Sequence, residues 1–258
     1  MSSREASLPC DREAFVAKLR AVGTRAYHDK HPLHVAMNAG ELSPDTIRAW
    51  ITNRFYYQQN IPRKDAAIIS NCPLREVRRI WLHRITDHDG DGSNPGGIEA
   101  WLRLGEASGM DRGELLENRH LLPAVRFAVD AYVQFARTQP WPIAVASSLT
   151  ELFAPDLMAE RLAAFERHYT WIAPAGFEYF RQRLTQARTD SAQALELTLA
   201  HCDTTQLQEA ALSALAFKCD VLWSILDAIA FASGRITPPQ TQPLSEDGRR
   251  SWHSVETR

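Results

Sequence analysis

The sequence has few cysteines and lacks any long apolar run. Its four cysteines, Cys10, Cys72, Cys202 and Cys219, form no CxxC pair, so we expect reduced thiols rather than a disulfide framework or a zinc-binding cysteine set. No apolar run approaches the roughly 20 residues that span a bilayer. The N-terminal stretch MSSREASLPCDREAF carries charge where a signal peptide needs an apolar core. We therefore expect a cytoplasmic protein that is not attached to a membrane.

The sequence also lacks an excess of charge of either sign. Lys and Arg total 29 and Asp and Glu total 31 among 258 residues, which gives a formal net charge of −2. Nothing in this balance attracts nucleic acid or an anionic membrane, and we expect neither as a partner. The GxGxxG, Walker and GxSxG motifs are absent too, which removes the usual signals for dinucleotide binding, P-loop chemistry and serine hydrolysis.

Apolar residues recur at spacings of three and four, and alternation of period two is nearly absent, which predicts an all-α protein. We expect a flexible N-terminus over 1–10, a single all-α catalytic domain over 11–234 and a Pro-rich arm or disordered tail over 235–258. Pro62 is expected to kink or interrupt a helix. The predicted helices cover 11–22, 44–61, 63–70, 74–88, 97–108, 121–138, 141–152, 155–166, 172–202 and 206–233.

Polar side chains interrupt the apolar face of several predicted helices. Arg54 and Gln58 fall in the middle of the arc that Ile47, Trp50 and Ile61 define on one helix. Similar spacing places further polar residues on or beside the apolar faces of other helices: Arg84, His88, Tyr132, Glu151, Arg161, Tyr179, Arg183 and Lys218. A buried charge without a partner costs several kcal/mol, so these residues need an explanation.

Two interpretations of these residues remain open from spacing alone. If the faces converge, the residues line a polar cavity that holds four fixed cations against one carboxylate, namely Arg54, Arg84, Arg183 and Lys218 against Glu151. Such a cavity would suit an anionic ligand with several carboxylates. The alternative is a buried network in which the same cations pair with other acids, such as Asp65, Asp130 or Asp220.

Two segments superficially suggest metal binding. In DHDGDGSNPGGIE, three aspartates fit the start of an EF-hand loop, but Ile98 occupies the twelfth position, where a bidentate acid is required. His28, His31 and His34 are closely spaced, but Pro32 breaks the helix between them. We interpret the first segment as a loop and the second as an irregular turn with hydrogen-bonded histidines, and we predict no metal site.

Several longer stretches resemble the pyrroloquinoline-quinone (PQQ) synthase family, from about residue 11 to about residue 230. They are HPLHVAMNAGELSP, NRFYYQQNIPRKDAAI, ITDHDG, GGIEAWLRLGEASG, RFAVDAY, SSLTELFAP and FKCDVLW. The resemblance implies a compact bundle of the haem-oxygenase-like type and a homodimer. It also implies an oxidase that closes a ring in a polycarboxylate quinone precursor and oxidises it with O2 to PQQ, the last step of PQQ biosynthesis. Hydrogen peroxide would be released, and no metal or organic cofactor would be used.

The resemblance also implies roles for particular residues. The catalytic set would be His28, His88, Glu151, Tyr179 and Arg183. The substrate-binding set would be Tyr27, Arg54, Gln58, Lys64, Arg84, Tyr132, Arg161 and Lys218. We expect His88 to act as general base, because a histidine pKa is easily tuned near neutrality. Met158 stands where the family commonly has an active-site histidine, and a thioether cannot transfer protons.

Three other functions remain open. A TenA-like hydrolase of the same fold would need a nucleophilic cysteine in the cavity, for which Cys72 and Cys219 are the candidates. A diiron oxidase would need several convergent Glu, Asp and His ligands. A protein that holds PQQ or its precursor without catalysis would share the basic cavity, and Met158 is compatible with that function.

Overall fold

A computed structural model describes residues 8–235, with only the backbone given for 185–189. Over this range the chain is helical and contains no strand, which confirms the predicted all-α class. The helices are α1 (Arg12–Ala26), η1 (His28–Lys30), α2 (Pro32–Asn38), α3 (Pro44–Asn71), α4 (Arg75–Asp89), α5 (Gly96–Ala107), α6 (Arg112–Leu116), α7 (Pro123–Thr138), α8 (Trp141–Ala146), η2 (Ser147–Phe153), α9 (Ala154–His168), η3 (Pro174–Phe177), α10 (Glu178–His201) and α11 (Thr205–Ala232), where η denotes a 3₁₀ helix.

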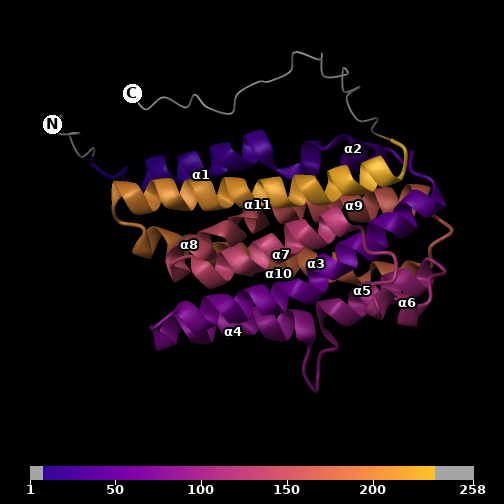
Figure 1. The fold of residues 1–258 in the computed structure, drawn as a ribbon, viewed down its shortest axis with the longest axis horizontal. Coiled ribbons are helices and arrows are strands. Elements are labelled where there is room, and N and C mark those ends of the chain that lie inside the picture. Colours follow the sequence, from indigo (N-terminus) through magenta and orange to yellow (C-terminus); the bar gives the residue numbers. More distant parts are fainter. Residues whose placement is uncertain (1–7, 236–258) are drawn as a thin grey trace, which may run out of the picture.

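The helices stack in tiers around α3 and α11, the two longest elements (Figure 1). Helices α1 and α11 run side by side along one edge, and α4 lies along the opposite edge against α3. Between them, α7 contacts both α3 and α11, while α10 packs on α8, α9 and η2. Polar side chains on the inner faces of α3, α4, α10 and α11 are therefore directed toward the middle of the bundle.

Helix α3 begins as predicted and continues further than predicted. The Ser43 hydroxyl accepts a hydrogen bond from the Thr46 amide at 3.2 Å, and Pro44 occupies the first turn. The prediction that Pro62 would divide the segment was wrong, since a single helix runs from Pro44 to Asn71. Proline removes one backbone hydrogen bond, but contacts of α3 with α4, α5, α7 and α11 hold the helix on both sides of it.

The predicted helix over 141–152 is in fact two elements. The α-helix ends at Ala146, and a 3₁₀ helix continues to Phe153. This change of pitch places Thr150 and Glu151 against the interior. The short helices α2 and α6 were not predicted, since neither is long enough to show a period.

The predictions for the two ends of the chain remain predictions. Residues 1–7 and 236–258 lie outside the described residues, so most of the predicted N-terminal segment and C-terminal arm is not described. Among the described helices, none combines the length and the hydropathy needed to cross a bilayer.

A glycine in α1 permits the close approach of η2. A Cβ atom on Gly23 would lie 2.0 Å from ring atoms of Phe153, and that ring already packs against Tyr27, with ring centroids 5.3 Å apart. We expect Gly23→Ala to lower the free energy of unfolding by about 1–3 kcal/mol, because the ring must shift. Urea unfolding measures the change.

Gly92→Ala is the matched control, since a Cβ atom there meets nothing within 4 Å. It should change stability by less than about 0.5 kcal/mol. A Gly23→Ala protein as stable as the control would show that η2 does not depend on this contact.

Candidate active site

A small cavity lies between the inner faces of α3, α4, α9, α10, α11 and η2. Its volume is about 50 Å³. It is lined by Tyr27, His28, Arg54, Tyr57, Ile61, His88, Thr150, Glu151, Ala154, Met158, Tyr179, Arg183 and Leu222. All five residues predicted as catalytic, together with Tyr27 and Arg54, thus come from distant parts of the sequence to one cavity.

The other predicted site residues are buried directly behind this wall. Gln58 accepts a hydrogen bond from the Tyr179 hydroxyl at 3.1 Å. Arg84 is buried and binds Glu151, Arg161 lines an adjoining void together with Arg54 and His28, and Lys218 contacts Tyr57. Two members lie further back: Lys64 donates to Ser148 at 3.1 Å, and the Tyr132 hydroxyl accepts from Ser147 at 3.3 Å.

One half of the site consists of cations that are paired with acids. Arg84 forms a bidentate ion pair with Glu151, with N–O distances of 2.6 and 2.8 Å. Arg183 lies 3.1 Å from Asp190 and 3.6 Å from Glu151. Burial opposes ionisation of Glu151, but Arg84 and Arg183 outweigh it and lower the pKa of this carboxyl to about 2.

Asp65 also belongs to the paired half of the site. Its contacts answer the question of whether acids other than Glu151 pair with the buried cations. Its carboxylate binds Lys64, accepts from the Trp81 indole at 2.8 Å and lies 3.5 Å from Arg84. The prediction of a single carboxylate among the cations was therefore wrong, since Asp65 and Asp190 join Glu151. Asp130 and Asp220, the other acids considered, are exposed and bind none of these cations.

The other half of the site holds cations without acid partners. Within the described part of the chain, Arg54, Arg161 and Lys218 form no ion pair with a carboxylate. Burial, Arg54 and Lys64 lower the pKa of Lys218 well below its usual value, and burial together with Arg54 lowers that of Arg161 to about 9. These cations repel one another, so an anion bound among them would gain their full attraction.

Aromatic and imidazole groups hold the unpaired cations in place. Lys218 donates to the Tyr57 hydroxyl at 2.6 Å and lies 3.9 Å from the centre of the Tyr132 ring. Arg161 donates to Nδ1 of His34 at 2.8 Å. Burial and then Arg161 lower the pKa of His34 to about 2, which keeps this imidazole neutral and able to accept.

His88 has the geometry of a neutral base. Its Nδ1 lies 3.0 Å from the backbone carbonyl of Arg84. Because a carbonyl can only accept, Nδ1 carries the proton and Nε2 keeps its lone pair. Burial and then Arg183 lower the pKa of His88 to about 4, so the ring is uncharged at neutral pH. His28 is also held neutral, by burial and by its neighbour His34.

Sequence reasoning missed Tyr57, His34 and Asp190. Tyr57 follows Arg54 by three residues and Asp190 follows Arg183 by seven, so helical spacing places each on the same face as a predicted residue. That spacing could have identified both. His34 was predicted to be hydrogen-bonded, but no local signal points to Arg161 as its partner. Met158 does lie in the cavity wall, where a histidine was expected for the family.

The two segments that superficially suggest metal binding were predicted to form a loop and a turn. His31 caps α2 by accepting from the Leu33 amide at 3.0 Å, and its other ring nitrogen lies 3.0 Å from Asp227. His31 and His34 are thus hydrogen-bonded as predicted, but Nδ1 of His28 has no hydrogen-bond partner among the described residues, and the segment forms η1 and α2 rather than an irregular turn. Asp91 accepts from the backbone amides of Ser93 and Asn94, so it closes a turn rather than an EF-hand loop.

Comparison with solved structures defines the class of fold. A TenA homologue from Pseudomonas syringae pv. tomato superimposes with a TM-score of 0.68 at 15% identity, covering 89% of this chain and all of the other. A domain of unknown function from Shewanella denitrificans with a haem oxygenase-like fold gives a TM-score of 0.67 at 14% identity, covering 86% of this chain and 93% of the other. The chain therefore has a haem oxygenase-like fold.

Sequence comparison then defines the family. The model of the TENA/THI-4/PQQC family matches residues 16–228, and the chain belongs to this family. It is 54% identical to a pyrroloquinoline-quinone synthase of Pseudomonas aeruginosa over 243 residues, which are 94% of this chain and 96% of the relative. It is 53% identical to one of Pseudomonas entomophila over 245 residues, 95% of this chain and 96% of the relative. The resemblance found in the sequence is confirmed.

The neutral histidines predict how stability changes with pH. The folded-state pKa of His88 lies near 4 and its ordinary value is 6.5, so on acidification the unfolded chain takes up the proton first. The free energy of unfolding should be fully retained above pH 6.5 and should fall as pH drops toward 4, by about 1.4 kcal/mol per pH unit for each such histidine. Denaturant unfolding over this range measures the slope.

His88→Gln should make that slope shallower by about the contribution of one histidine. His120→Gln removes an exposed histidine that does not line the cavity and should keep the slope of the parent protein. Equal slopes in all three proteins would contradict the assignment of His88 as a buried neutral group.

Proposed function

We propose that this chain is a pyrroloquinoline-quinone synthase, an oxidase that closes a ring in the polycarboxylate precursor of PQQ and oxidises it with O2. The observation that carries the proposal is a cavity lined by Arg54 and by the neutral His88, with Arg161 and Lys218, the other cations that lack an acid partner, buried behind its wall. The pyrroloquinoline-quinone synthases that match nearly the full chain support the same function.

The unpaired cations would bind the carboxylates of the substrate. Arg54, Arg161 and Lys218 supply guanidinium and ammonium donors that no acid of the described chain neutralises. A ligand with several carboxylates removes their mutual repulsion and gains charge-assisted hydrogen bonds. A cavity of about 50 Å³ is below the ~300 Å³ or more of ligand pockets, so the walls must separate when substrate binds.

His88 would act as the general base. Its Nε2 is unprotonated at neutral pH, and its Nδ1–H is fixed on the Arg84 carbonyl. Abstraction of a substrate proton leaves a carbanion whose electrons pass through the conjugated quinone to O2. In each such step the substrate loses a pair of electrons and a pair of protons, and O2 becomes hydrogen peroxide. Arg183 and Tyr179, on the same wall, would stabilise the negative charge that develops on oxygen.

The geometry favours this function over two of the alternatives. Cys72 and Cys219 are buried, neither lines the cavity, and burial raises the pKa of Cys219 to about 11, so neither suits the nucleophile of a hydrolase. For a diiron site, the cavity acid Glu151 would have to leave its bidentate pair with Arg84. A protein that holds PQQ without catalysis remains the second candidate, because Met158 in the wall is compatible with binding alone.

A single-turnover experiment separates catalyst from holder. Purified, metal-analysed protein is mixed with the ring-open precursor, first anaerobically and then with O2, while the quinone spectrum and peroxide are followed. We expect PQQ and peroxide only after O2 is added. Tight binding with a shifted spectrum but no oxidation would instead favour a holder, and Met158→His would then test whether the missing imidazole is the reason. His88→Gln should bind precursor but lose oxidation.

Substitution of an unpaired cation should weaken binding without unfolding the protein. Arg161→Met removes one charge-assisted contact, worth about 1.5–3 kcal/mol, so precursor affinity should fall by roughly 10- to 150-fold. Because the positive charge of Arg161 is repelled by that of Arg54, its removal should leave the thermal midpoint of unfolding unchanged. Arg167→Met, on the exposed side of the same helix, is the matched control and should leave affinity unchanged. Equal affinities in the two variants would overturn the assigned role of Arg161.

We also propose that the chain forms a homodimer, as the family resemblance implies. Phe127 on α7 is 80% exposed and lies in a surface groove between α3 and α7, which makes this face a candidate interface. The parent protein should have the mass of a dimer by light scattering, and Phe127→Glu should shift it toward monomer. Leu82→Glu, at an exposed site on α4, should not. A monomeric parent protein would refute the dimer, and a dimeric Phe127→Glu would exclude this face.

A further inference from the structure

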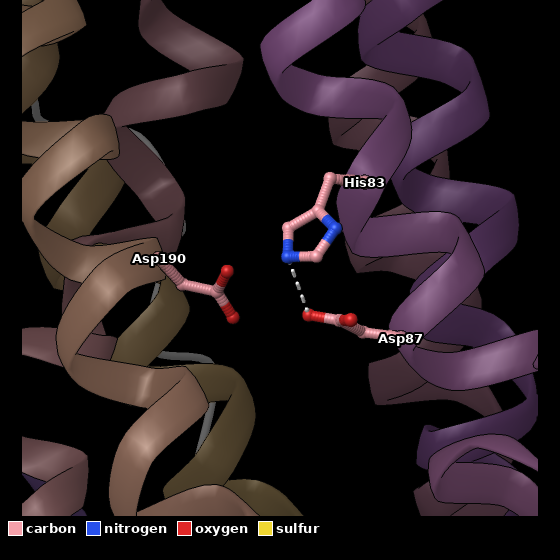
Figure 2. A group of neighbouring side chains, drawn as sticks. All are labelled: His83, Asp87 and Asp190. Carbon is pink, nitrogen blue, oxygen red and sulfur yellow. Dashed lines mark ion pairs between the residues drawn. The ribbon is translucent and has the colours of Figure 1, made fainter. Parts of the chain in front are cut away.

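A second cluster of ionisable side chains lies between α4 and α10, outside the cavity. It comprises His83 and Asp87 on α4 and Asp190 on α10 (Figure 2). His83 Nε2 lies 3.3 Å from Asp87 Oδ2, and one ligand atom from each of the three residues lies within 4.8 Å of the others. Asp87 and Asp190 are buried, whereas the His83 side chain is 55% exposed. The cluster therefore opens to solvent through the histidine.

Both aspartates direct an unsatisfied oxygen into this cluster. Asp190 is 1% exposed, yet its Oδ1 has no hydrogen-bond partner among the described residues, and the same holds for Asp87 Oδ2. Figure 2 shows the Asp190 carboxylate turned toward the imidazole and toward Asp87. Buried carboxylate oxygens are costly to leave unsatisfied, and adjacent carboxylates repel each other. A positive group placed between them would satisfy both.

The neighbouring cations do not supply that positive group. Asp190 uses its other oxygen, Oδ2, for Arg183 at 3.1 Å and Arg84 at 3.6 Å. In the connected network, the three cations Lys64, Arg84 and Arg183 face the three carboxylates Asp65, Glu151 and Asp190, whereas the ion pair of Asp87 is with His83. These three cations are therefore matched by their own three acids, and none of them reaches Asp87 Oδ2 or Asp190 Oδ1, the two oxygens that lack a hydrogen-bond partner among the described residues.

We propose that His83, Asp87 and Asp190 bind a divalent transition-metal ion, with Zn²⁺ as the best match. An imidazole nitrogen with two carboxylate oxygens suits zinc, whereas Mg²⁺ and Ca²⁺ prefer ligand sets made of oxygen alone. His83 and Asp87 are four residues apart on one helix face, the usual spacing of a helical ligand pair. Bonds of about 2 Å require the three ligand atoms to move closer together, and the His83 side chain, which is 55% exposed, has solvent on one side to allow this.

Such an ion would link α4 to α10. The ion would be held as a structural link, and it would exchange no electron with the substrate. The site does not depend on that proposed function, because none of its three ligands lines the cavity.

The test uses the full chain after removal of bound metal with a chelator. Zn²⁺ is titrated by calorimetry, and Co²⁺ is added separately so that its visible d–d absorption reports the ligand geometry. We expect one Zn²⁺ per chain, a rise in thermal midpoint and a Co²⁺ spectrum typical of nitrogen and oxygen ligands. His83→Ala should weaken Zn²⁺ binding by at least about tenfold and abolish the Co²⁺ spectrum.

Two further variants keep the test decisive. Asp87→Asn should also weaken binding, while His120→Ala, which removes another exposed histidine beside an acid, should bind Zn²⁺ like the parent protein. Because His83 is exposed, its replacement should not impair folding. Absence of Zn²⁺ binding to the parent protein, or equal binding by His83→Ala and His120→Ala, would overturn the proposal.

Discussion

The bidentate ion pair between Arg84 and Glu151 is the contact on which the rest of the site depends. It joins α4 to η2 and brings two fully ionised groups into the middle of a helical bundle. Buried pairs of this kind are tolerated only when their remaining hydrogen-bonding capacity is used. Asp65 and Arg183 provide part of that satisfaction, and the backbone carbonyl of Arg84 orients His88. Removal of Arg84 or Glu151 would thus disturb Asp65, Arg183 and the His88 imidazole together.

The two halves of the site differ in what they contribute to the free energy of folding. Arg84 and Arg183 are neutralised within the chain, so their burial is compatible with stability. Arg54, Arg161 and Lys218 are not neutralised by an acid of the described chain, and the lowered pKa values of Arg161 and Lys218 indicate a cost that the folded chain carries before any ligand binds. A polycarboxylate ligand would remove that cost, so binding and local stability should be coupled. The difference between the two halves would also orient the ligand, because its carboxylates would be attracted to the unpaired cations and repelled by Glu151.

The sequence was sufficient for the fold class and for most of the residues around the cavity, for a physical reason. A polar side chain on an apolar helical face is visible from spacing alone, which is how Arg54, Gln58 and Lys218 were found. Family resemblance added Tyr27, His28 and Lys64, whose local pattern is uninformative.

The counter-ions could not be predicted in the same way. Helical spacing places Asp190 on the same face as Arg183, but it does not show that this acid also reaches Arg84 on α4 across the bundle. Which cations stay unpaired is decided by these distant acids. Local propensity was likewise overridden where tertiary contacts dominate, as in the continuation of α3 through Pro62 and the 3₁₀ geometry around Glu151.

Asp190 also connects the cavity with the cluster beside it. Arg183 lies between Glu151 and Asp190, at 3.6 and 3.1 Å. Burial, and the nearby negative charges of Glu151 and Asp87, raise the pKa of the Asp190 carboxyl, whereas Arg84 and Arg183 oppose this rise. Whatever neutralises Asp190, a proton or a metal ion, weakens its hold on Arg183 and leaves that guanidinium more strongly attracted to Glu151 and to any anion in the cavity. The charge state of a solvent-accessible cluster is in this way transmitted to the wall where oxygen would be reduced.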